Sequence, residues 1–119
     1  MGERIRVRAS RRGRTLEIDG TFASFVPHVG GATGSVWDAL VAPLLALPRA
    51  RRRSALILGL GGGSAARIVR AIAPDAHVLG VEFDPAVVAA ARRHFDLGAL
   101  GIEIVCDDAR AVLARERRR

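Results

Sequence analysis

The sequence predicts an α/β fold in which a parallel β-sheet follows a small antiparallel region. Two observations predict the parallel sheet: residues 54–114 alternate short apolar runs with helix-like segments, and the glycine-rich stretch 59–63 directly follows the first apolar run. A third observation predicts the antiparallel region. Residues 5–8 and 15–19 alternate apolar and polar side chains with a period of two, as half-buried strands do.

The first 34 residues are expected to form β-hairpins. The connection between the two alternating segments contains Gly13, which indicates a hairpin turn. Residues 21–26 predict a third strand, and residues 27–34 predict a loop.

A helix is expected to begin after Ser35. Asp38 stands three positions beyond this serine, an arrangement close to a capping box. Pro43 predicts a kink or a division into two short helices, because proline lacks the N–H group that a helix interior needs. The arginine-rich residues 48–53 are expected to be a linker. The apolar residues spaced for one helical face are Val36, Leu40, Leu44 and Leu47.

From residue 54 onward the predicted order is β-α-β-α-β-α. The first strand, 55–58, is a continuous apolar run, which predicts burial on both faces. Right-handed crossovers give the strand order 3-2-1 of a Rossmann-like sheet. The remaining strands are expected at 77–82 and 102–106, and the helices at 64–73, 85–95 and from 109.

Three segments follow from this organisation. Residues 1–34 are the expected hairpin region, residues 35–53 the helix and arginine-rich linker, and residues 54–119 the Rossmann-like cofactor-binding domain.

The formal net charge of +7 arises from 19 arginines against 12 acidic residues, and the chain has no lysine. The arginine clusters lack the interleaved aromatic side chains on which bases stack, so we interpret them as solvated linkers and tails and expect no nucleic-acid partner.

Neither a membrane span nor a secretory signal is predicted. The apolar stretch 39–48 is shorter than the roughly 18 residues of a spanning helix, and the N-terminus has no apolar core. We therefore expect a cytoplasmic protein without a membrane partner.

Cys106 is the one cysteine, so the chain forms no internal disulfide, and we expect this thiol to be a small core residue on a strand. No metal cluster is predicted.

The candidate site lies at the carboxyl ends of the three predicted parallel strands, where open α/β sheets bind ligands. Its first component is the loop with Gly59, Gly61, Gly62 and Gly63. Glycine permits a tight turn and a close approach of the backbone to a ligand. The next helix begins there and offers free N–H groups.

Two groups of carboxylates complete the candidate site. Glu82 stands 21 residues beyond Gly61 at the end of the second strand, where it can accept hydrogen bonds from both hydroxyls of a ribose. Asp107 and Asp108 end the third strand, and Asp108 is interpreted as an adenine contact, as a helix N-cap, or as both. The sequence therefore predicts binding of an adenosine-containing cofactor, and it identifies no catalytic residue.

The motifs resemble the spermidine synthase-like branch of the class I S-adenosylmethionine-dependent methyltransferase superfamily. The resemblance covers roughly residues 15–114, and it rests on Leu56–Ser64, Val81–Val88, His94-Phe95 and Asp107–Arg110. It implies half of a methyltransferase fold, with S-adenosylmethionine or decarboxylated S-adenosylmethionine held by the glycine loop, Glu82 and Asp108. It also implies transfer of an aminopropyl or methyl group to a small molecule, with an amine as a possible acceptor.

The sequence departs from this family in three ways, one of which is that the family's tyrosine and histidine in the helix before the linker have no match near Val36 and Ala42. Gly62 occupies the place where family aminopropyltransferases carry an acid that pairs with an ammonium group. We therefore expect the intact cofactor to be preferred, because its carboxylate would be favoured by the N–H groups of Gly63, Ser64 and Ala65. The family's fourth strand and its catalytic aspartate have no counterpart in this sequence, so the cofactor-binding domain is expected to be truncated.

Two other interpretations stay open. The segment Gly61–Ala66 also fits the G-x-G-x-x-A pattern of an NAD(P)-binding domain, in which Glu82 would serve equally well. A non-catalytic nucleotide-binding or interaction module is the other, because half a sheet leaves an edge open to another chain, including a second copy in a homo-oligomer.

Overall fold

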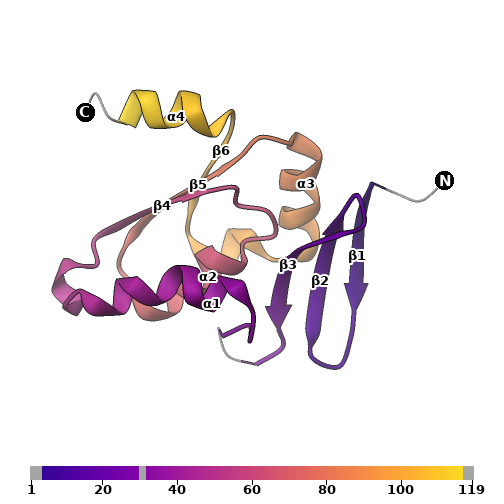
Figure 1. Ribbon diagram of the computed structural model, residues 1–119, viewed down its shortest axis with the longest axis horizontal. Helices are drawn as coiled ribbons and strands as arrows, with labels where there is room; N and C mark the ends of the chain where they lie inside the picture. The colour runs from indigo at the N-terminus through magenta and orange to yellow at the C-terminus, as the bar shows by residue number, and fades with distance from the viewer. Residues whose placement is uncertain (1–3, 30–31, 117–119) are drawn as a thin grey trace.

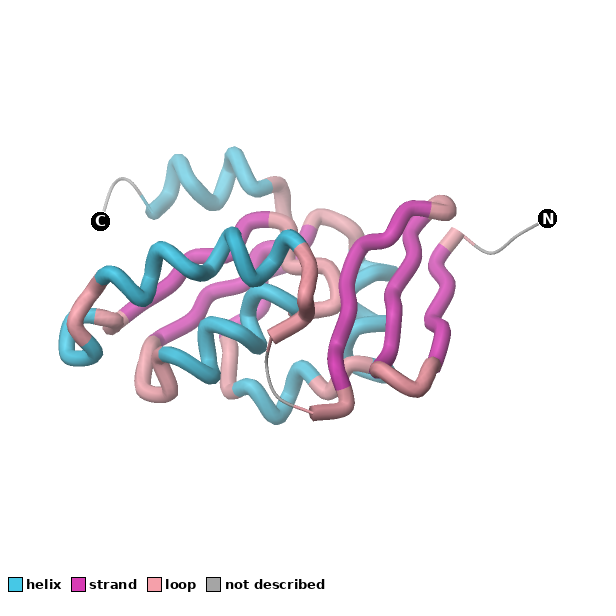
Figure 2. Tube along the Cα trace, turned by 60° about the horizontal axis from the view of Figure 1, so that its bottom comes forward, coloured by secondary structure: helices cyan, strands magenta, loops and turns pink. Residues whose placement is uncertain are grey.

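The computed structural model describes residues 4–29 and 32–116. In these residues two three-stranded sheets lie side by side, an antiparallel sheet near the N-terminus and a parallel sheet flanked by helices (Figure 1, Figure 2). The antiparallel strands are β1 (Ile5–Ala9), β2 (Gly13–Ile18) and β3 (Thr21–Pro27), and the parallel strands are β4 (Ser54–Leu58), β5 (His77–Glu82) and β6 (Glu103–Cys106). The predicted fold class and the third antiparallel strand are confirmed.

The antiparallel sheet is shaped by its second turn and by a bulge. Asp19 and Gly20 both have positive φ values, and this turn joins Ile18 of β2 to its partner Thr21 of β3. Farther along, Leu16 pairs with Ser24 and Glu17 pairs with Phe22, so β3 has one residue more than β2 at this point. Such a bulge re-aims the neighbouring side chains.

The parallel sheet has the predicted order, β4-β5-β6, with β5 in the middle. Helix α2 (Ser64–Ile72) connects β4 to β5, and α3 (Pro85–His94) and the 3₁₀ turn η3 (Leu97–Leu100) connect β5 to β6. Helix α4 (Ala109–Glu116) follows β6. Helices α1 and α2 lie on one face of the sheet, and α4 lies on the opposite face (Figure 1).

Proline divides the first helix as predicted. Helix α1 (Val36–Val41) is followed by the 3₁₀ turn η1 (Ala42–Ala46), which has Pro43 in its first turn, and η2 (Arg49–Arg51) precedes β4. The capping differs from the prediction, because the Ser35 side chain makes no capping bond. The Asp38 carboxylate instead accepts hydrogen bonds from the N–H groups of Thr33 and Gly34, both at 2.8 Å, and so fixes the preceding loop.

Three clusters of buried side chains form the core. One lies between α1, α2 and the parallel sheet, and a second lies between α2, α3 and η3. The third joins the two sheets, since Leu16 of β2 packs against Val87 and Phe95 at the two ends of α3. The antiparallel sheet is therefore held against the parallel one by shared apolar burial.

Strand β4 is not buried on both faces as expected. Leu56 and Leu58 are 39% and 42% exposed, whereas the alternate side chains of Ala55 and Ile57 pack in the core. The reason is the position of α4, which contacts β5 and leaves this face of β4 uncovered.

The predicted apolar face of the first helix is correct only at Leu44. Leu40 is 66% exposed, and the residues that pack on the core are Trp37, Val41 and Leu44. The exposed leucine lines a groove of about 590 Å³ that runs between α1 and β4 as far as Gly59. Trp37 and Val41 each follow a predicted residue by one position, so the buried face of α1 is rotated by about one residue from the predicted one.

Cys106 is exposed, which corrects the expectation of a core thiol. It is the last residue of β6, which is a four-residue strand at the edge of the sheet. Its Sγ lies 3.6 Å from the carbonyl oxygen of Phe83, to which it donates.

Some arginines serve the fold instead of lying in solvent. Arg52, expected in a solvated linker, donates to the carbonyl oxygens of Leu47 at 2.9 Å and Ile72 at 2.8 Å. Arg70 donates to the carbonyls of Leu100 at 2.8 Å and Ala76 at 2.7 Å.

Among the described residues, no helix has the length and apolarity needed to cross a membrane. The cytoplasmic location and the absence of a nucleic-acid partner stay predictions from the sequence.

The contact between the two sheets yields a stability prediction. Leu16→Ala should lower the free energy of unfolding by about 2–5 kcal/mol, because it opens a cavity at a side chain that is 0% exposed. Val29→Ala, at an exposed loop position, should change it by less than about 0.5 kcal/mol. Urea titrations followed by circular dichroism measure both values, and equal small effects would contradict the packing described here.

Candidate functional site

The glycine loop forms a tight turn between β4 and α2. Gly59, Gly61 and Gly63 have φ values of +77°, +55° and +86°, a region that strongly favours glycine. The N–H groups of Gly59 and Leu60 both donate to the carbonyl oxygen of Val81 at 2.9 Å, which ties the loop to the end of β5. The loop is thus positioned at the carboxyl edge of the parallel sheet.

The remaining N–H groups of the loop are also engaged. Gly61 donates to Glu82 Oε1 at 2.9 Å, and Gly62 donates to Ser24 Oγ at 2.7 Å. Gly63 donates to the carbonyl oxygen of Leu60 at 2.9 Å. This last bond corrects the expectation that the Gly63 N–H group is free to hold a carboxylate. The N–H groups of Ser64 and Ala65 belong to the first turn of α2, where helical N–H groups have no partner within the helix.

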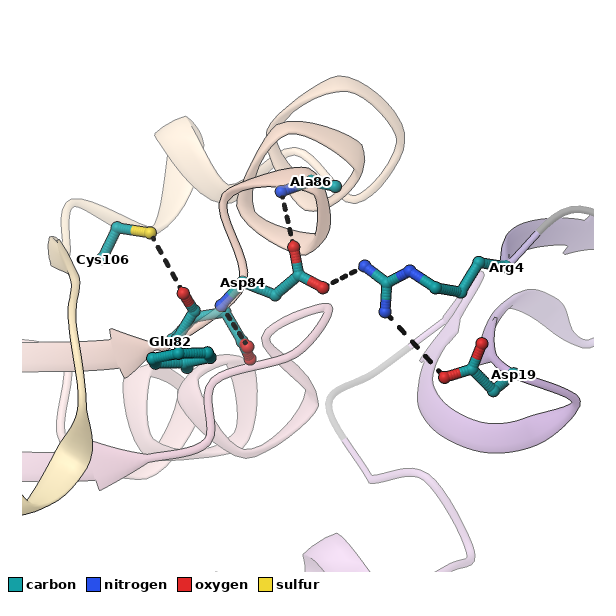
Figure 3. A network of polar contacts seen from close by, with 7 residues as sticks. Arg4, Asp19, Glu82, Asp84, Ala86 and Cys106 are labelled. Atoms are coloured by element: carbon teal, nitrogen blue, oxygen red, sulfur yellow. Dashed lines mark hydrogen bonds and ion pairs between the residues drawn. The ribbon is translucent and has the colours of Figure 1, made fainter.

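Glu82 lies where the sequence predicts, at the last position of β5, and its side chain is half-buried. Its Oε1 atom accepts from the N–H group of Gly61. Its Oε2 atom accepts from the N–H group of Asp84 at 3.1 Å, a contact drawn in Figure 3. Two backbone groups therefore hold the carboxylate in one orientation. Each oxygen of a carboxylate has a second lone pair, so both can still accept from a ligand hydroxyl.

Asp84 joins the site to the antiparallel sheet. Its carboxylate caps α3 by accepting from the N–H group of Ala86 at 2.9 Å, and it pairs with the guanidinium of Arg4 (Figure 3). The same guanidinium lies 3.9 Å from Asp19 Oδ2. The hydrogen bond from Arg4, followed by that from Ala86, lowers the pKa of Asp84 below its ordinary value.

Asp107 and Asp108 lie beside Glu82 at the same edge. The N–H group of Asp107 donates to the carbonyl oxygen of Glu82 at 3.1 Å, which sets the ends of β5 and β6 together. Asp108 Oδ1 accepts from the N–H group of Arg110 at 2.8 Å, which is the N-cap interaction weighed from the sequence. The N–H group of Asp108 and the Arg115 side chain lower the pKa of Asp107. A contact of Asp108 with adenine stays a prediction.

The sequence interpretation missed two residues at this edge. Phe83 directly follows Glu82 and is 74% exposed. Its position next to the acid at the end of a strand is the sequence signal that could have indicated it. Ser24 comes from β3 and is 1% exposed. No pattern in the sequence indicates Ser24, because its contact with Gly62 joins positions 38 residues apart.

The assembled edge suits recognition of a diol beside a narrow backbone turn. It combines the oriented carboxylate of Glu82, the turn at Gly59 and the exposed ring of Phe83. In residues 4–29 and 32–116, no group of three or more His, Cys, Asp or Glu side chains could hold a metal ion.

The chain is similar in sequence to a probable polyamine aminopropyl transferase and in structure to spermidine synthases. It is 41% identical over 85 residues to a probable polyamine aminopropyl transferase from Bifidobacterium longum. It aligns with a probable spermidine synthase from Corynebacterium glutamicum at a TM-score of 0.74 with 25% identity, over 91% of this chain. It also shares the fold of the spermidine synthase from Thermotoga maritima, at a TM-score of 0.66 with 21% identity over 87% of this chain.

The similarity covers only part of each relative. The matched residues are 71% of this chain but 18% of the Bifidobacterium protein, and the alignments cover 42% and 36% of the two crystallised chains. No family model matches the sequence. Similarity to spermidine synthases in sequence and structure agrees with the resemblance derived from the motifs.

The Arg4–Asp84 pair predicts a pH dependence of stability. Because the pKa of Asp84 is lowered in the folded state, its contribution is present above the unfolded value of about 3.9 and is lost as the pH falls through the folded value. Asp84→Asn keeps a side chain that can cap α3 but removes this charge. The loss of stability between about pH 7 and about pH 3 should therefore be smaller in the variant.

Urea titrations at the two pH values measure this difference. Asp75→Asn, in the exposed turn after α2, is the matched control and should lose as much stability as the unmodified protein. An Asp84→Asn variant with the full acid-induced loss would refute the assignment.

Proposed function

We propose that the carboxyl edge of the parallel sheet binds an adenosine-containing sulfonium, S-adenosylmethionine or its decarboxylated form, as the donor site of an aminopropyl- or methyl-transferring protein. The single observation that carries this proposal is the orientation of Glu82. Its carboxylate is held by the Gly61 and Asp84 N–H groups beside the glycine turn, with acceptor capacity left for a ribose diol.

The surrounding residues fit the rest of such a ligand. A Cβ atom added at Gly59 would meet no atom within 4 Å, so open space adjoins the turn where backbone and ligand would approach. The exposed ring of Phe83 offers a flat apolar surface for a purine. Asp108 caps α4 through Oδ1, and its carboxylate retains acceptor capacity for an exocyclic amine.

The donor, when bound, supplies a sulfonium whose attached carbon atoms are electrophilic. The role of this chain's residues is to bind and orient that donor. Aligning the attacking amine with the reacting carbon removes much of the activation barrier in such transfers. We propose a small amine as the acceptor, since the similar proteins include a probable polyamine aminopropyl transferase and a probable spermidine synthase. The chain spans less than half of each relative, and we assign no catalytic base within it.

A nicotinamide dinucleotide is the competing ligand. The segment Gly61–Ala66 fits its glycine pattern, and Glu82 would bind its ribose equally well. The similarity to an aminopropyl transferase and to spermidine synthases favours the sulfonium donor. A titration with NAD that gives tighter binding than either sulfonium would reverse this choice.

Glu82→Gln tests the ribose contact. The substitution keeps the side-chain shape but removes the charge, so the affinity for S-adenosylmethionine should fall by about 1.5–3 kcal/mol. Glu103→Gln is the matched control, since Glu103 is an exposed glutamate of β6 paired with His77, at the opposite end of the sheet, and its loss should leave affinity unchanged. Isothermal titration calorimetry measures both, and equal affinities for a folded Glu82→Gln variant and the unmodified chain would exclude the proposed contact.

The choice between the two donors tests the role of the glycine loop. No acid stands at Gly62 to pair with the ammonium of the decarboxylated form, whereas the N-terminal turn of α2 favours the carboxylate of the intact form by about 0.3–1 kcal/mol. We therefore expect tighter binding of intact S-adenosylmethionine. Calorimetric dissociation constants for both donors measure the preference, and tighter binding of the decarboxylated form would point to ordinary aminopropyl transfer.

A further inference from the structure

We propose that Ser24 is a positioning residue of the cofactor site, which holds the glycine loop in shape from the antiparallel sheet and requires glycine at position 62. The inference rests on the proposed function for its effect on ligand binding. That Ser24 holds the loop in shape is argued separately, from the contacts between β3 and the loop. Ser24 Oγ accepts the hydrogen bond of the Gly62 N–H group at 2.7 Å, and both residues are buried.

The bulge in β3 brings Ser24 to the loop. Leu16 pairs with Ser24 and Glu17 with Phe22, so Ala23 is the additional residue that interrupts the regular alternation of side chains. Ser24 is buried while Phe22 is exposed. The bulge thereby places the Ser24 side chain against the backbone of the glycine loop. There its Oγ atom supplies the acceptor that the Gly62 N–H group needs.

A second serine fixes the same junction from the opposite side. Ser64 Oγ, at the start of α2, donates to the carbonyl oxygen of Phe25 at 2.8 Å and accepts from its N–H group at 2.7 Å. Residues 24 and 25 of β3 are thus each bonded to the segment 62–64. The contact of Ser24 with Gly62 and the contacts of Phe25 with Ser64 together set the distance and the register between β3 and the loop.

The contact also restricts which residues the loop can contain. A Cβ atom added at Gly62 would lie 2.7 Å from Ser24 Cβ, and one added at Gly61 would lie 2.8 Å from Ser24 Oγ. The φ of Gly62 is not positive, so the restriction at this position comes from Ser24 and not from the backbone. Without Ser24, the next atom near that Cβ is Phe95 Cδ1 at 3.5 Å, an ordinary contact.

Ser24 and Gly62 therefore act as a pair that excludes a side chain from the middle of the loop. An acid at position 62, which would serve a cationic ligand, cannot be introduced while Ser24 is present. Gly62→Asp alone is therefore expected to disturb the loop and not to move the ligand preference. Ser24 helps to determine specificity by keeping the loop free of an ammonium partner.

The first experiment compares Ser24→Ala with Ser10→Ala in the full chain. Ser24→Ala keeps the Cβ atom and removes the acceptor, so amide hydrogen exchange at Gly62 should accelerate about tenfold or more. The affinity for S-adenosylmethionine, measured by calorimetry well below the unfolding temperature, should weaken about tenfold. Ser10→Ala removes a hydroxyl from the exposed hairpin turn and should change neither value. Unchanged exchange at Gly62 in the Ser24→Ala variant would overturn the proposal.

The second experiment is a double-mutant cycle of Ser24→Gly and Gly62→Ala, with thermal unfolding as the readout. Gly62→Ala alone should lower the unfolding temperature, and Ser24→Gly in the same chain should recover part of that loss because it removes the opposing Cβ atom. Additive losses would show that the two positions are not coupled and would contradict the proposal.

The outcomes separate this inference from the proposed function. If the unmodified chain binds neither sulfonium, the proposed function fails, while exchange at Gly62 and the cycle still decide whether Ser24 controls the loop. If the chain binds the donor and Ser24→Ala weakens only thermal stability, Ser24 is structural and the positioning role fails. Weakened affinity together with faster exchange supports both.

Discussion

The structure depends on how the buried backbone of the glycine loop satisfies its N–H groups. A turn packed between two sheets must pair these groups with protein acceptors, because an unpaired buried donor costs about as much as a lost hydrogen bond. Two strands provide the acceptors outside the loop: β5, through the carbonyl oxygen of Val81 and the side chain of Glu82, and β3, through Ser24. Each of these contacts also orients a component of the candidate site, so the fold and the site share the same bonds.

The antiparallel sheet is consequently part of the site and not an appendage. It contributes Ser24 to the glycine loop and Arg4 to the carboxylate that caps α3. Leu16 packs with Val87 and Phe95 and holds the two sheets at the distance that these polar contacts need. The division of the chain into a hairpin region and a cofactor-binding domain, made from the sequence, stays a prediction, and the contacts join the two segments closely.

Local signals in the sequence predicted the elements, and long-range packing accounts for what was missed. The break at Pro43 and the placement of Glu82 at the end of β5 follow from local chemistry, namely a missing N–H group and the end of an apolar run. The exposure of Leu56 and of Cys106 does not, since it depends on where α4 lies and on β6 being an edge strand. Ser24 was missed for the same reason, because a bulge and a partner 38 residues away give it its role.

Binding of an adenosine-bearing ligand at the carboxyl edge of the parallel sheet can be located residue by residue, by amide chemical-shift mapping with methylthioadenosine. We expect shifts concentrated in residues 59–64, 82–84 and 107–109, with the amides of β1 unmoved. A saturable set of shifts centred instead on the groove between α1 and β4, or no shifts at millimolar ligand, would contradict it.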